Sequence, residues 1–278
     1  MKILIIGASS YVGARIYFDF KGKYELIGTY FNNPLSKKFI KLDLTDRKSV
    51  KKLISEQKPD VIIHVANYPN ARSAVGNEKR YIALNRDATE TLVKEANLVN
   101  SKLVFISGQA ALVTDNIYGK LKAESEKIVK QVKAGYLILR PRLIIGFSPN
   151  TINDRTFNKL LKCIDGKVKV VEFDSSWKFQ PTYIGHLFQM IDQVIKSSRW
   201  NLTLPVLVNK ITTQYELAKD VLGKFNIKVK EVDLKLTFPT INDDLTEFNK
   251  FDLKPRTYEE MISTIVEEIK NRNKFKIQ

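Results

Sequence analysis

The stretch KILIIGASSYVG, residues 2–13, decides the fold of this chain. Its apolar run ends at Gly7, and a helical pattern begins at Tyr11. A buried strand that turns at a glycine into a helix is the context in which a dinucleotide binds. In that motif Gly7 allows a tight turn, Gly13 lets the helix pack closely on the strand, and free N–H groups hold a pyrophosphate. The residues of this turn that we expect at a dinucleotide are Gly7, Ser9, Ser10, Tyr11, Val12 and Gly13.

The same alternation of apolar runs and helical patterns continues through the first half of the chain. We expect strands at 2–6, 24–30, 39–42, 61–65, 102–107 and 136–139, and helices at 11–20, 48–57, 77–99 and 118–132. Strands that are continuously apolar and alternate with helices predict a parallel sheet covered on both faces. The alternative for the glycine turn is a purely structural one, because many α/β proteins place a glycine after their first strand.

The regular alternation of strand and helix patterns ends after Gly146. This change divides the chain into a domain at 1–146 and a lobe at 147–278. Helical and strand patterns are mixed in this second part, so we expect a smaller α+β lobe that binds the substrate. A helix at 185–197 is expected to return to the first domain. The predicted fold class is α/β, a doubly wound parallel sheet of the Rossmann type followed by this lobe.

The composition excludes a disordered chain, because 44% of its 278 residues are hydrophobic and 10% are aromatic. Cys163 is the only cysteine and there are two histidines, so we expect no disulfide framework and no metal site. The apolar run at residues 3–6 is too short for a signal core, and no stretch reaches about 18 apolar residues. We therefore expect a cytoplasmic protein that makes no contact with membranes.

The chain carries a large positive charge, with 46 Lys and Arg against 30 Asp and Glu and a formal net charge of +16. Most of the excess lies in residues 1–150, which hold 25 basic and 13 acidic residues. The basic residues are scattered among acids, as on a solvated lysine-rich surface. The charge therefore favours a phosphate-bearing small molecule as partner over a nucleic acid.

The end of the second expected strand indicates which dinucleotide binds. A carboxylate at this place would bind both ribose hydroxyls and select NAD. The place is taken by neutral residues followed by two lysines: Tyr30, Phe31, Asn32, Asn33, Lys37 and Lys38. We therefore expect NADP(H) as cofactor, in contact with Tyr30 and Asn32. NAD(H) is the alternative if the lysines are ordinary loop charges.

A short acidic segment, Leu-Asp-Leu-Thr-Asp at 42–46, follows the next expected strand. Asp43 can accept a hydrogen bond from an adenine amino group, with Leu44 beside it. Asp46 is instead expected to cap the helix that follows, because a carboxylate there can accept from the first free N–H groups.

Tyr118 and Lys122 stand four residues apart at the start of an expected helix and share one of its faces. A free phenol has a pKa of about 10 and is a poor acid or base near neutrality. A neighbouring ammonium group stabilises the phenolate and lowers that pKa. The phenol can then exchange a proton with a carbonyl or alcohol. The pattern is common by chance, so its value lies in its position after the strand at 102–107.

Together these motifs resemble the extended short-chain dehydrogenase/reductases, and within them the dTDP-4-dehydrorhamnose reductase-like branch. The resemblance covers nearly the whole chain. The segments that carry it are 7–13, 28–30, 42–46, 59–64, Asn85, 105–107, 118–126, 139–141 and 180–187. It implies a Rossmann domain with a sugar-nucleotide lobe, and the reduction by NADPH of a keto group on a nucleotide-linked sugar.

The resemblance also implies roles for particular residues. Tyr118 would be the general acid, and Lys122 would lower its pKa and bind the nicotinamide ribose. Ala66 and Asn67 would line the nicotinamide side of the site, and Arg140 with Pro141 its far wall. Val65 and Arg140 are counted with the residues that bind the cofactor. Helices at 77–99 and 118–132 often form a dimer interface in such folds, which makes a homodimer one expected assembly.

The chain departs from the family pattern at Gly108, where the family places a serine or threonine that bonds the substrate oxygen. Ser107 or Gln109 could replace that hydroxyl if the loop is rearranged, so Ser107 is the third predicted catalytic residue. The link from Gly108 to Tyr118 is also short, and His186 stands where an aspartate is common.

Two other functions stay open at this point. An epimerase or dehydratase that cycles bound NAD would call for a carboxylate after the second strand, and none stands there. A non-catalytic nucleotide-binding subunit that regulates a partner enzyme is favoured by Gly108. The intact pair of Tyr118 and Lys122 argues against that second alternative.

Overall fold

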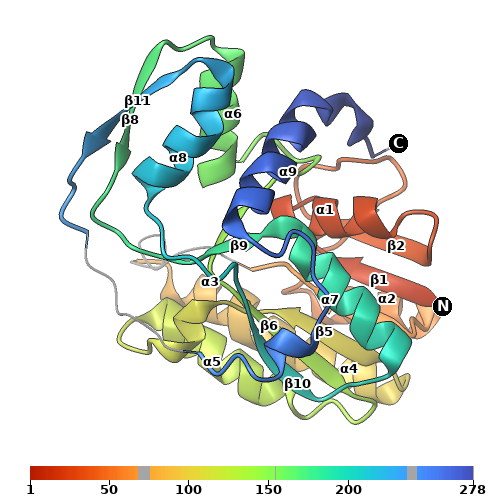
Figure 1. Cartoon of the computed structure of the whole chain (residues 1–278). Coiled ribbons are helices and arrows are strands. Elements are labelled where there is room, and N and C mark those ends of the chain that lie inside the picture. Colours follow the sequence, from red (N-terminus) through yellow and green to blue (C-terminus); the bar gives the residue numbers. More distant parts are fainter. Residues whose placement is uncertain (68–75, 154, 237–242, 278) are drawn as a thin grey trace.

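Seven parallel strands form the central sheet of the computed structural model, which describes residues 1–67, 76–153, 155–236 and 243–277 (Figure 1). In the sheet the order is β10-β6-β5-β4-β1-β2-β3. The strands are β1 (Lys2–Ile6), β2 (Glu25–Tyr30), β3 (Ile40–Lys41), β4 (Val61–His64), β5 (Lys102–Ile106), β6 (Tyr136–Pro141) and β10 (Leu202–Val206). The order turns back at β1, between β2 and β4, and ligands of such sheets bind at the carboxyl ends of the strands beside that point.

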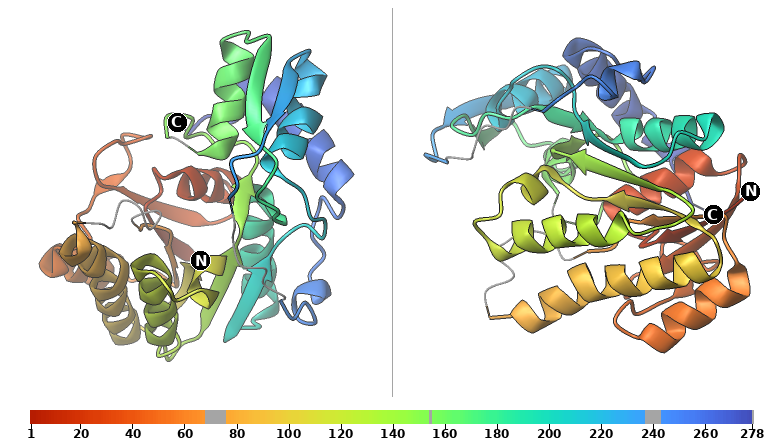
Figure 2. Two further views of the ribbon diagram at one scale, coloured as in Figure 1. Left: turned by 90° about the vertical axis from the view of Figure 1, so that its left-hand side faces the viewer. Right: turned by 90° about the horizontal axis from the view of Figure 1, so that it is seen from below.

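Helices cover both faces of the sheet, as Figure 2 shows. Residues 3–6 of β1 are all apolar because both faces of the strand are buried: Ile3 and Ile5 enter the core on one face, and Leu4 and Ile6 enter the core on the other. The helices in these two layers are α1 (Tyr11–Phe20) and α7 (Ile184–Ser197) on the first face, and α2 (Arg47–Gln57), α4 (Ala88–Leu98) and α5 (Ile117–Val129) on the second. The predicted doubly wound Rossmann fold is confirmed.

Two elements differ from the expected pattern. The helix expected at 77–99 consists of α3 (Glu78–Ile82), a π-helical turn (Ala83–Asp87) and α4. Strand β10 was not expected, because Pro205 interrupts a run that otherwise reads as a strand. Proline is tolerated here because β10 lies at the edge of the sheet, where one side of the strand needs no donor. The cap predicted for α2 is confirmed, since Asp46 accepts from the N–H groups of Lys48 and Ser49.

The second lobe is a small α+β unit that lies beside the carboxyl edge of the main sheet (Figure 1). Its elements are α6 (Thr156–Asp165), β8 (Val170–Asp174), α8 (Gln214–Leu222) and β11 (Lys228–Val232), with β8 and β11 paired in parallel. A second parallel pair, β7 (Leu143–Ile145) with β9 (Pro181–Tyr183), connects the lobe to the sheet. Helix α7, the helix expected at 185–197, packs on α1. None of the helices in the described parts of the chain combines the length and apolar character needed to cross a membrane.

A buried polar cluster joins the lobes through α9 (Tyr258–Lys270). The carboxylate of Glu268 lies 2.7 Å from the guanidinium of Arg15 and accepts from the Tyr183 hydroxyl at 2.6 Å. It also accepts from the backbone N–H of Phe147 at 3.0 Å. The Arg15 guanidinium bonds Asp19 as well, at 2.7 Å. The exposed fractions of Arg15 and Glu268 are 5% and 7%, so this ion pair is shielded from water.

The only two histidines of the sequence, His64 and His186, are buried in different places. The Nε2 atom of His64 lies 3.1 Å from the hydroxyl of Thr89, and that of His186 lies 2.8 Å from the carbonyl of Pro255. Burial, reinforced by the charge of Lys122, lowers the pKa of His64 to about 3. Burial also lowers the pKa of His186 to about 4, although its bond to the Pro255 carbonyl opposes this.

We expect these two histidines to weaken the fold in mild acid. Below pH 6.5 they bind protons in the unfolded chain and not in the native one, so the free energy of unfolding falls as the pH falls. Each contributes up to about 1.4 kcal/mol for each pH unit. Urea unfolding at pH 5 and pH 7 should show a smaller pH effect in the double variant His64→Gln, His186→Gln. Asp19, whose pKa burial raises to about 6, acts in the opposite direction in both proteins. An equal pH effect in the two proteins would contradict the prediction.

Candidate active site

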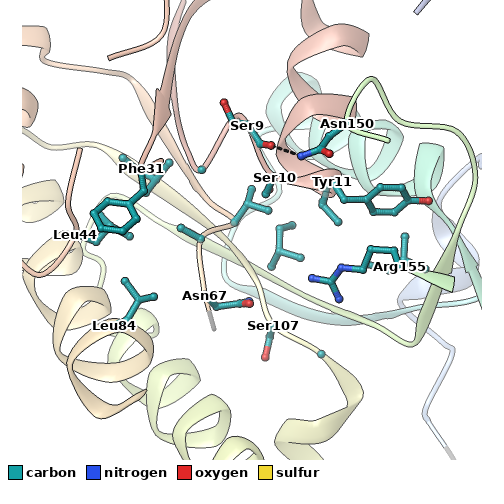
Figure 3. A pocket seen from close by; sticks show the side chains of 18 of the residues that line it. Ser9, Ser10, Tyr11, Phe31, Leu44, Asn67, Leu84, Ser107, Asn150 and Arg155 are labelled. Atoms are coloured by element: carbon teal, nitrogen blue, oxygen red, sulfur yellow. Dashed lines mark hydrogen bonds between the residues drawn. The ribbon is translucent and has the colours of Figure 1, made fainter. Parts of the chain in front are cut away.

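A cavity of about 1040 Å³ lies at the carboxyl edge of the sheet, between the two lobes (Figure 3). It brings together residues from the glycine turn, the ends of β2, β4 and β5, and the start of α5. The predicted site residues that line it are Gly7, Ser9, Ser10, Tyr11, Val12, Tyr30, Asn32, Asp43, Leu44, Val65, Ala66, Asn67, Ser107 and Tyr118. Three other predicted residues, Gly13, Lys122 and Arg140, are described by the structure but are not among the residues that line it.

The glycine turn has the geometry that a pyrophosphate site needs. Gly7 has a φ of +88°, and a Cβ on it would lie 3.0 Å from the Cβ of Ala66. A Cβ on Gly13 would lie 2.1 Å from the carbonyl oxygen of Gly7, so only glycine allows α1 to approach β1 this closely. The hydroxyl of Ser10 caps α1 by accepting from the N–H of Gly13 at 3.0 Å. Since Tyr11 opens α1 and lines the cavity, this helix end, with its free N–H groups, borders the cavity and could bind an anion there.

Apolar side chains form one end of the cavity, where Figure 3 shows Phe31, Leu44 and Leu84 close to one another. Asp43 lies beside them, and its carboxylate accepts from the N–H and the hydroxyl of Thr45 at 2.9 and 2.7 Å. This end offers two apolar surfaces and a fixed carboxylate, which suits a purine base. The sequence analysis did not assign Phe31 or Leu84, because a single aromatic or leucine residue gives no local signal for base binding.

Ser107 lies at the end of β5, and its hydroxyl donates to the buried carboxylate of Glu126 at 2.6 Å. The guanidinium of Arg140 binds both oxygens of the same carboxylate, at 2.9 and 2.6 Å. Arg140 therefore stands behind Ser107, while its neighbour Pro141 lines the cavity. A serine hydroxyl has a single hydrogen to donate, so this arrangement leaves Ser107 an acceptor toward the cavity. A direct cofactor contact by Arg140 stays a prediction.

Tyr118 and Lys122 lie one turn apart on α5 but in different surroundings. Tyr118 lines the cavity, and burial raises the pKa of its phenol, while the charge of Arg155 opposes this. Lys122 is fully buried, donates to the carbonyl of Ile106 at 3.3 Å and has its Nζ 4.7 Å from the centre of the Phe105 ring. Burial lowers the pKa of Lys122 to about 7. The action of Lys122 on the phenol of Tyr118 stays a prediction.

Gly108 is in an extended conformation and lines the cavity beside Ser107. The nearest atom that a Cβ on Gly108 would meet is the carbonyl oxygen of Pro141, at 3.8 Å. The backbone therefore has room for the hydroxyl-bearing side chain that the family places here. Gln109 also lines the cavity, and its amide is the neighbouring group that could serve instead of a hydroxyl.

Side chains of the second lobe, and Arg142 just before it, complete the cavity, although no sequence pattern indicated them. Asn150 donates to the carbonyl of Ser9 at 2.6 Å and so ties the lobe to the glycine turn (Figure 3). Arg142 is paired with Asp243, and Trp177 and Arg155 complete this side of the cavity. Lone cations in a lysine-rich chain give no signal of their own, so only the folded structure identifies these positions.

Comparison with known proteins agrees with this architecture. The family model "RmlD substrate binding domain" matches residues 1–237. The dTDP-4-dehydrorhamnose reductase of Aggregatibacter actinomycetemcomitans is 27% identical over 210 residues, covering 69% of this chain and 67% of that protein. Methionine adenosyltransferase 2 subunit beta of Bos taurus is 25% identical over 259 residues, covering 81% of this chain and 72% of that protein.

Solved structures show the same fold. The dTDP-4-dehydrorhamnose reductase of Bacillus anthracis, crystallised in complex with NADP, superposes with a TM-score of 0.80 at 22% identity and covers 96% of this chain and 99% of that one. UDP-glucose 4-epimerase of Thermotoga maritima superposes with a TM-score of 0.79 at 15% identity, covering 98% of this chain and 100% of that one. The resemblance to the extended short-chain dehydrogenase/reductases is confirmed. Because the family model spans most of the sequence, the chain belongs to the RmlD substrate binding domain family.

Proposed function

We propose that this protein is an NADP(H)-dependent reductase of a keto group on a nucleotide-activated sugar. One observation carries the proposal: a single cavity is lined by the glycine turn, by Tyr118 and by Arg155 of the second lobe. A dinucleotide on the turn and a second anionic ligand on the lobe would therefore meet at the phenol. The neutral end of β2, at Tyr30 and Asn32, and the NADP bound by the Bacillus anthracis relative favour NADP(H), with NAD(H) as the alternative.

The residues around the phenol have separable roles in this proposal. The reduced dinucleotide, when bound, supplies a hydride. Tyr118 is protonated at neutral pH, because burial raises its pKa, and donates its proton to the carbonyl oxygen of the substrate. Ala66 and Asn67 hold the nicotinamide side of the cavity. Lys122, one turn from Tyr118, binds the ribose and stabilises the phenolate.

The experiment is direct. The purified protein is mixed with NADPH and a dTDP- or UDP-4-keto sugar, and the absorbance of the reduced nicotinamide is followed. Cofactor binding is measured separately, by titration with NADPH and NADH. Oxidation that depends on the sugar supports the reductase. A preference for NADH would overturn the cofactor assignment, and NADPH binding without oxidation of any such sugar would overturn the reductase itself.

A second candidate is a nucleotide-binding subunit without catalytic activity. Gly108 removes one hydroxyl from the site, and Ser107 has its hydrogen bound to Glu126. The Bos taurus relative is named as a subunit of methionine adenosyltransferase. This candidate predicts NADPH binding without turnover, and a change in the activity of a partner enzyme. The same titration and turnover measurements therefore separate the two candidates.

A serine at position 108 would restore the hydroxyl that the site lacks, and this provides a second test of the proposed reductase. Gly108→Ser should raise kcat by about tenfold or more, because a donor beside the developing charge is worth at least that much. Gly108→Ala is the matched control, since it adds the same Cβ into the same free space without a hydroxyl. Its kcat should equal that of the wild type. Equal kcat values for the serine and alanine variants would contradict the prediction.

A further inference from the structure

The phenol of Tyr118 has few partners on the side of the dinucleotide-binding domain. The hydroxyl of Ser107 donates to Glu126 at 2.6 Å, and Gly108 has no side chain. The Nζ of Lys122 donates to the carbonyl of Ile106 at 3.3 Å. A phenolate in a partly buried site is costly unless a positive charge stabilises it. A phenolate at Tyr118 therefore calls for a further positive charge in the cavity.

Arg155 of the second lobe can supply this positive charge. It stands directly before the first residue of α6 in the second lobe and lines the same cavity as Tyr118 and Ser107. Figure 3 shows its guanidinium pointing into the cavity. Within the described residues no carboxylate is paired with Arg155, whereas Arg142, in the same wall, is paired with Asp243. The positive charge of Arg155 is therefore available to a ligand in the cavity.

The charges around Tyr118 come from several elements. Lys122 lies on its own helix, Arg80 and Tyr81 belong to α3, and Arg142 and Arg155 lie on the side of the second lobe. Among these, the charge of Arg155 lowers the pKa of Tyr118 and Tyr81 raises it, while burial raises it most. The charge of Arg155 also lowers the pKa of Tyr11, at the head of α1. Its field therefore reaches both sides of the cavity.

We propose that Arg155 stabilises the negative charge that appears on Tyr118 and on the substrate oxygen as the proton passes between them. This inference rests on the proposed reductase. Hydride addition to the carbonyl carbon moves the π electron pair to the oxygen, the oxygen takes the proton of Tyr118, and the phenolate regains a proton from solvent. Arg155 keeps its proton throughout and acts by charge alone. The second lobe then supplies part of the catalytic electrostatics as well as the substrate site.

The test uses the phenol itself and needs neither cofactor nor substrate. Ultraviolet absorbance follows tyrosine ionisation against pH, and the difference between the wild type and Tyr118→Phe isolates Tyr118. In the Arg155→Gln background the pKa of Tyr118 should be higher by about 1 pH unit or more, as removal of a close opposite charge predicts. Arg155→Lys should keep most of the wild-type value. Lys162→Gln, which removes an exposed charge from the same helix, should leave it unchanged.

Turnover gives a second and separate readout. If the reductase is active, Arg155→Gln should lower kcat and move its pH profile toward higher pH. An unchanged titration of Tyr118 in Arg155→Gln overturns the role of Arg155, whatever the turnover shows. A shifted titration in a protein that reduces no sugar overturns the reductase and leaves the electrostatic pairing. Arg155 is exposed, so its replacement should cost the fold little.

Discussion

Tyr118→Phe should lower kcat by roughly a hundredfold to ten-thousandfold, the contribution of a positioned general acid. The substitution keeps the ring, and with it the packing at the start of α5, and removes only the hydroxyl. Tyr118 lines the cavity together with Ser107, whose hydroxyl hydrogen is bound to Glu126, and with Gly108, which has no side chain. Neither of these two residues can supply the proton in its place, so the loss should fall on kcat.

Cofactor binding separates this chemical effect from a structural one. The proposed pyrophosphate site is the glycine turn, to which Tyr118 does not belong, so the Kd for NADPH should stay within about twofold of the wild type. Tyr136→Phe is the matched control, because Tyr136 is a half-buried residue of β6 that does not line the cavity. Its kcat should be unchanged. Wild-type turnover in Tyr118→Phe would remove this residue from the mechanism.

The sequence pattern predicted the central sheet well because burial on both faces leaves strands with no polar positions. Residues 2–6 and 61–64 are apolar throughout apart from Lys2 and His64, and both became inner strands. The pattern failed at β10, an edge strand with a proline, where only one side of the strand is paired. It also merged α3, the π-helical turn and α4 into one helix, because the hydrophobic period differs little between them.

The candidate site also contains residues that local sequence patterns predict and residues that only the fold brings together. The glycine turn and the pair of Tyr118 and Lys122 are local motifs, so a few adjacent residues predict both. The bonds of Ser107 to Glu126 and of Glu126 to Arg140 join residues 19 and 14 positions apart, and only the fold brings them together. Arg155 lines the same cavity as Tyr118 but belongs to the other lobe. No local pattern could indicate it.

The cavity shows where part of the positive charge of the chain lies. Among its described lining residues, the cations are Arg80, Arg142 and Arg155, and the carboxylate is Asp43. Asp43 is the chain neighbour of Leu44, and Figure 3 shows Leu44 and Arg155 at opposite ends of the cavity. A cavity with this distribution attracts phosphates, and its size suits two small molecules better than a polymer. The excess of lysines elsewhere remains an ordinary solvated surface.

Glu268→Ala should cost the fold about 3–5 kcal/mol, the largest stability effect we expect, because it leaves Arg15 buried without its main partner. Arg15 and Glu268 have side-chain exposures of 6% and 8%, so water cannot replace the lost contact. The hydroxyl of Tyr183 and the N–H of Phe147 would lose their acceptor in the same step. The measurement is urea unfolding at neutral pH.

Glu267→Ala is the matched control, since Glu267 is the exposed neighbour on the same helix and its loss should change stability by less than about 0.5 kcal/mol. Equal stability of the two variants would contradict the role of the buried pair.

Glu268→Ala should also weaken the binding of NADPH, although Glu268 does not line the cavity. Segment 146–150, which Glu268 holds at Phe147, is tied to the glycine turn at three points, one of them the bond that the Tyr11 hydroxyl donates to the carbonyl of Gly146. The hydroxyl of Ser148 donates to the carbonyl of Tyr11 at 2.6 Å, and the amide of Asn150 donates to the carbonyl of Ser9 at 2.6 Å. Loosening this segment frees the turn that holds the pyrophosphate. We therefore expect the Kd for NADPH to rise about tenfold in folded Glu268→Ala, equivalent to about 1.4 kcal/mol, and to stay unchanged in Glu267→Ala. An unchanged Kd in Glu268→Ala would mean that the glycine turn keeps its shape without support from the second lobe.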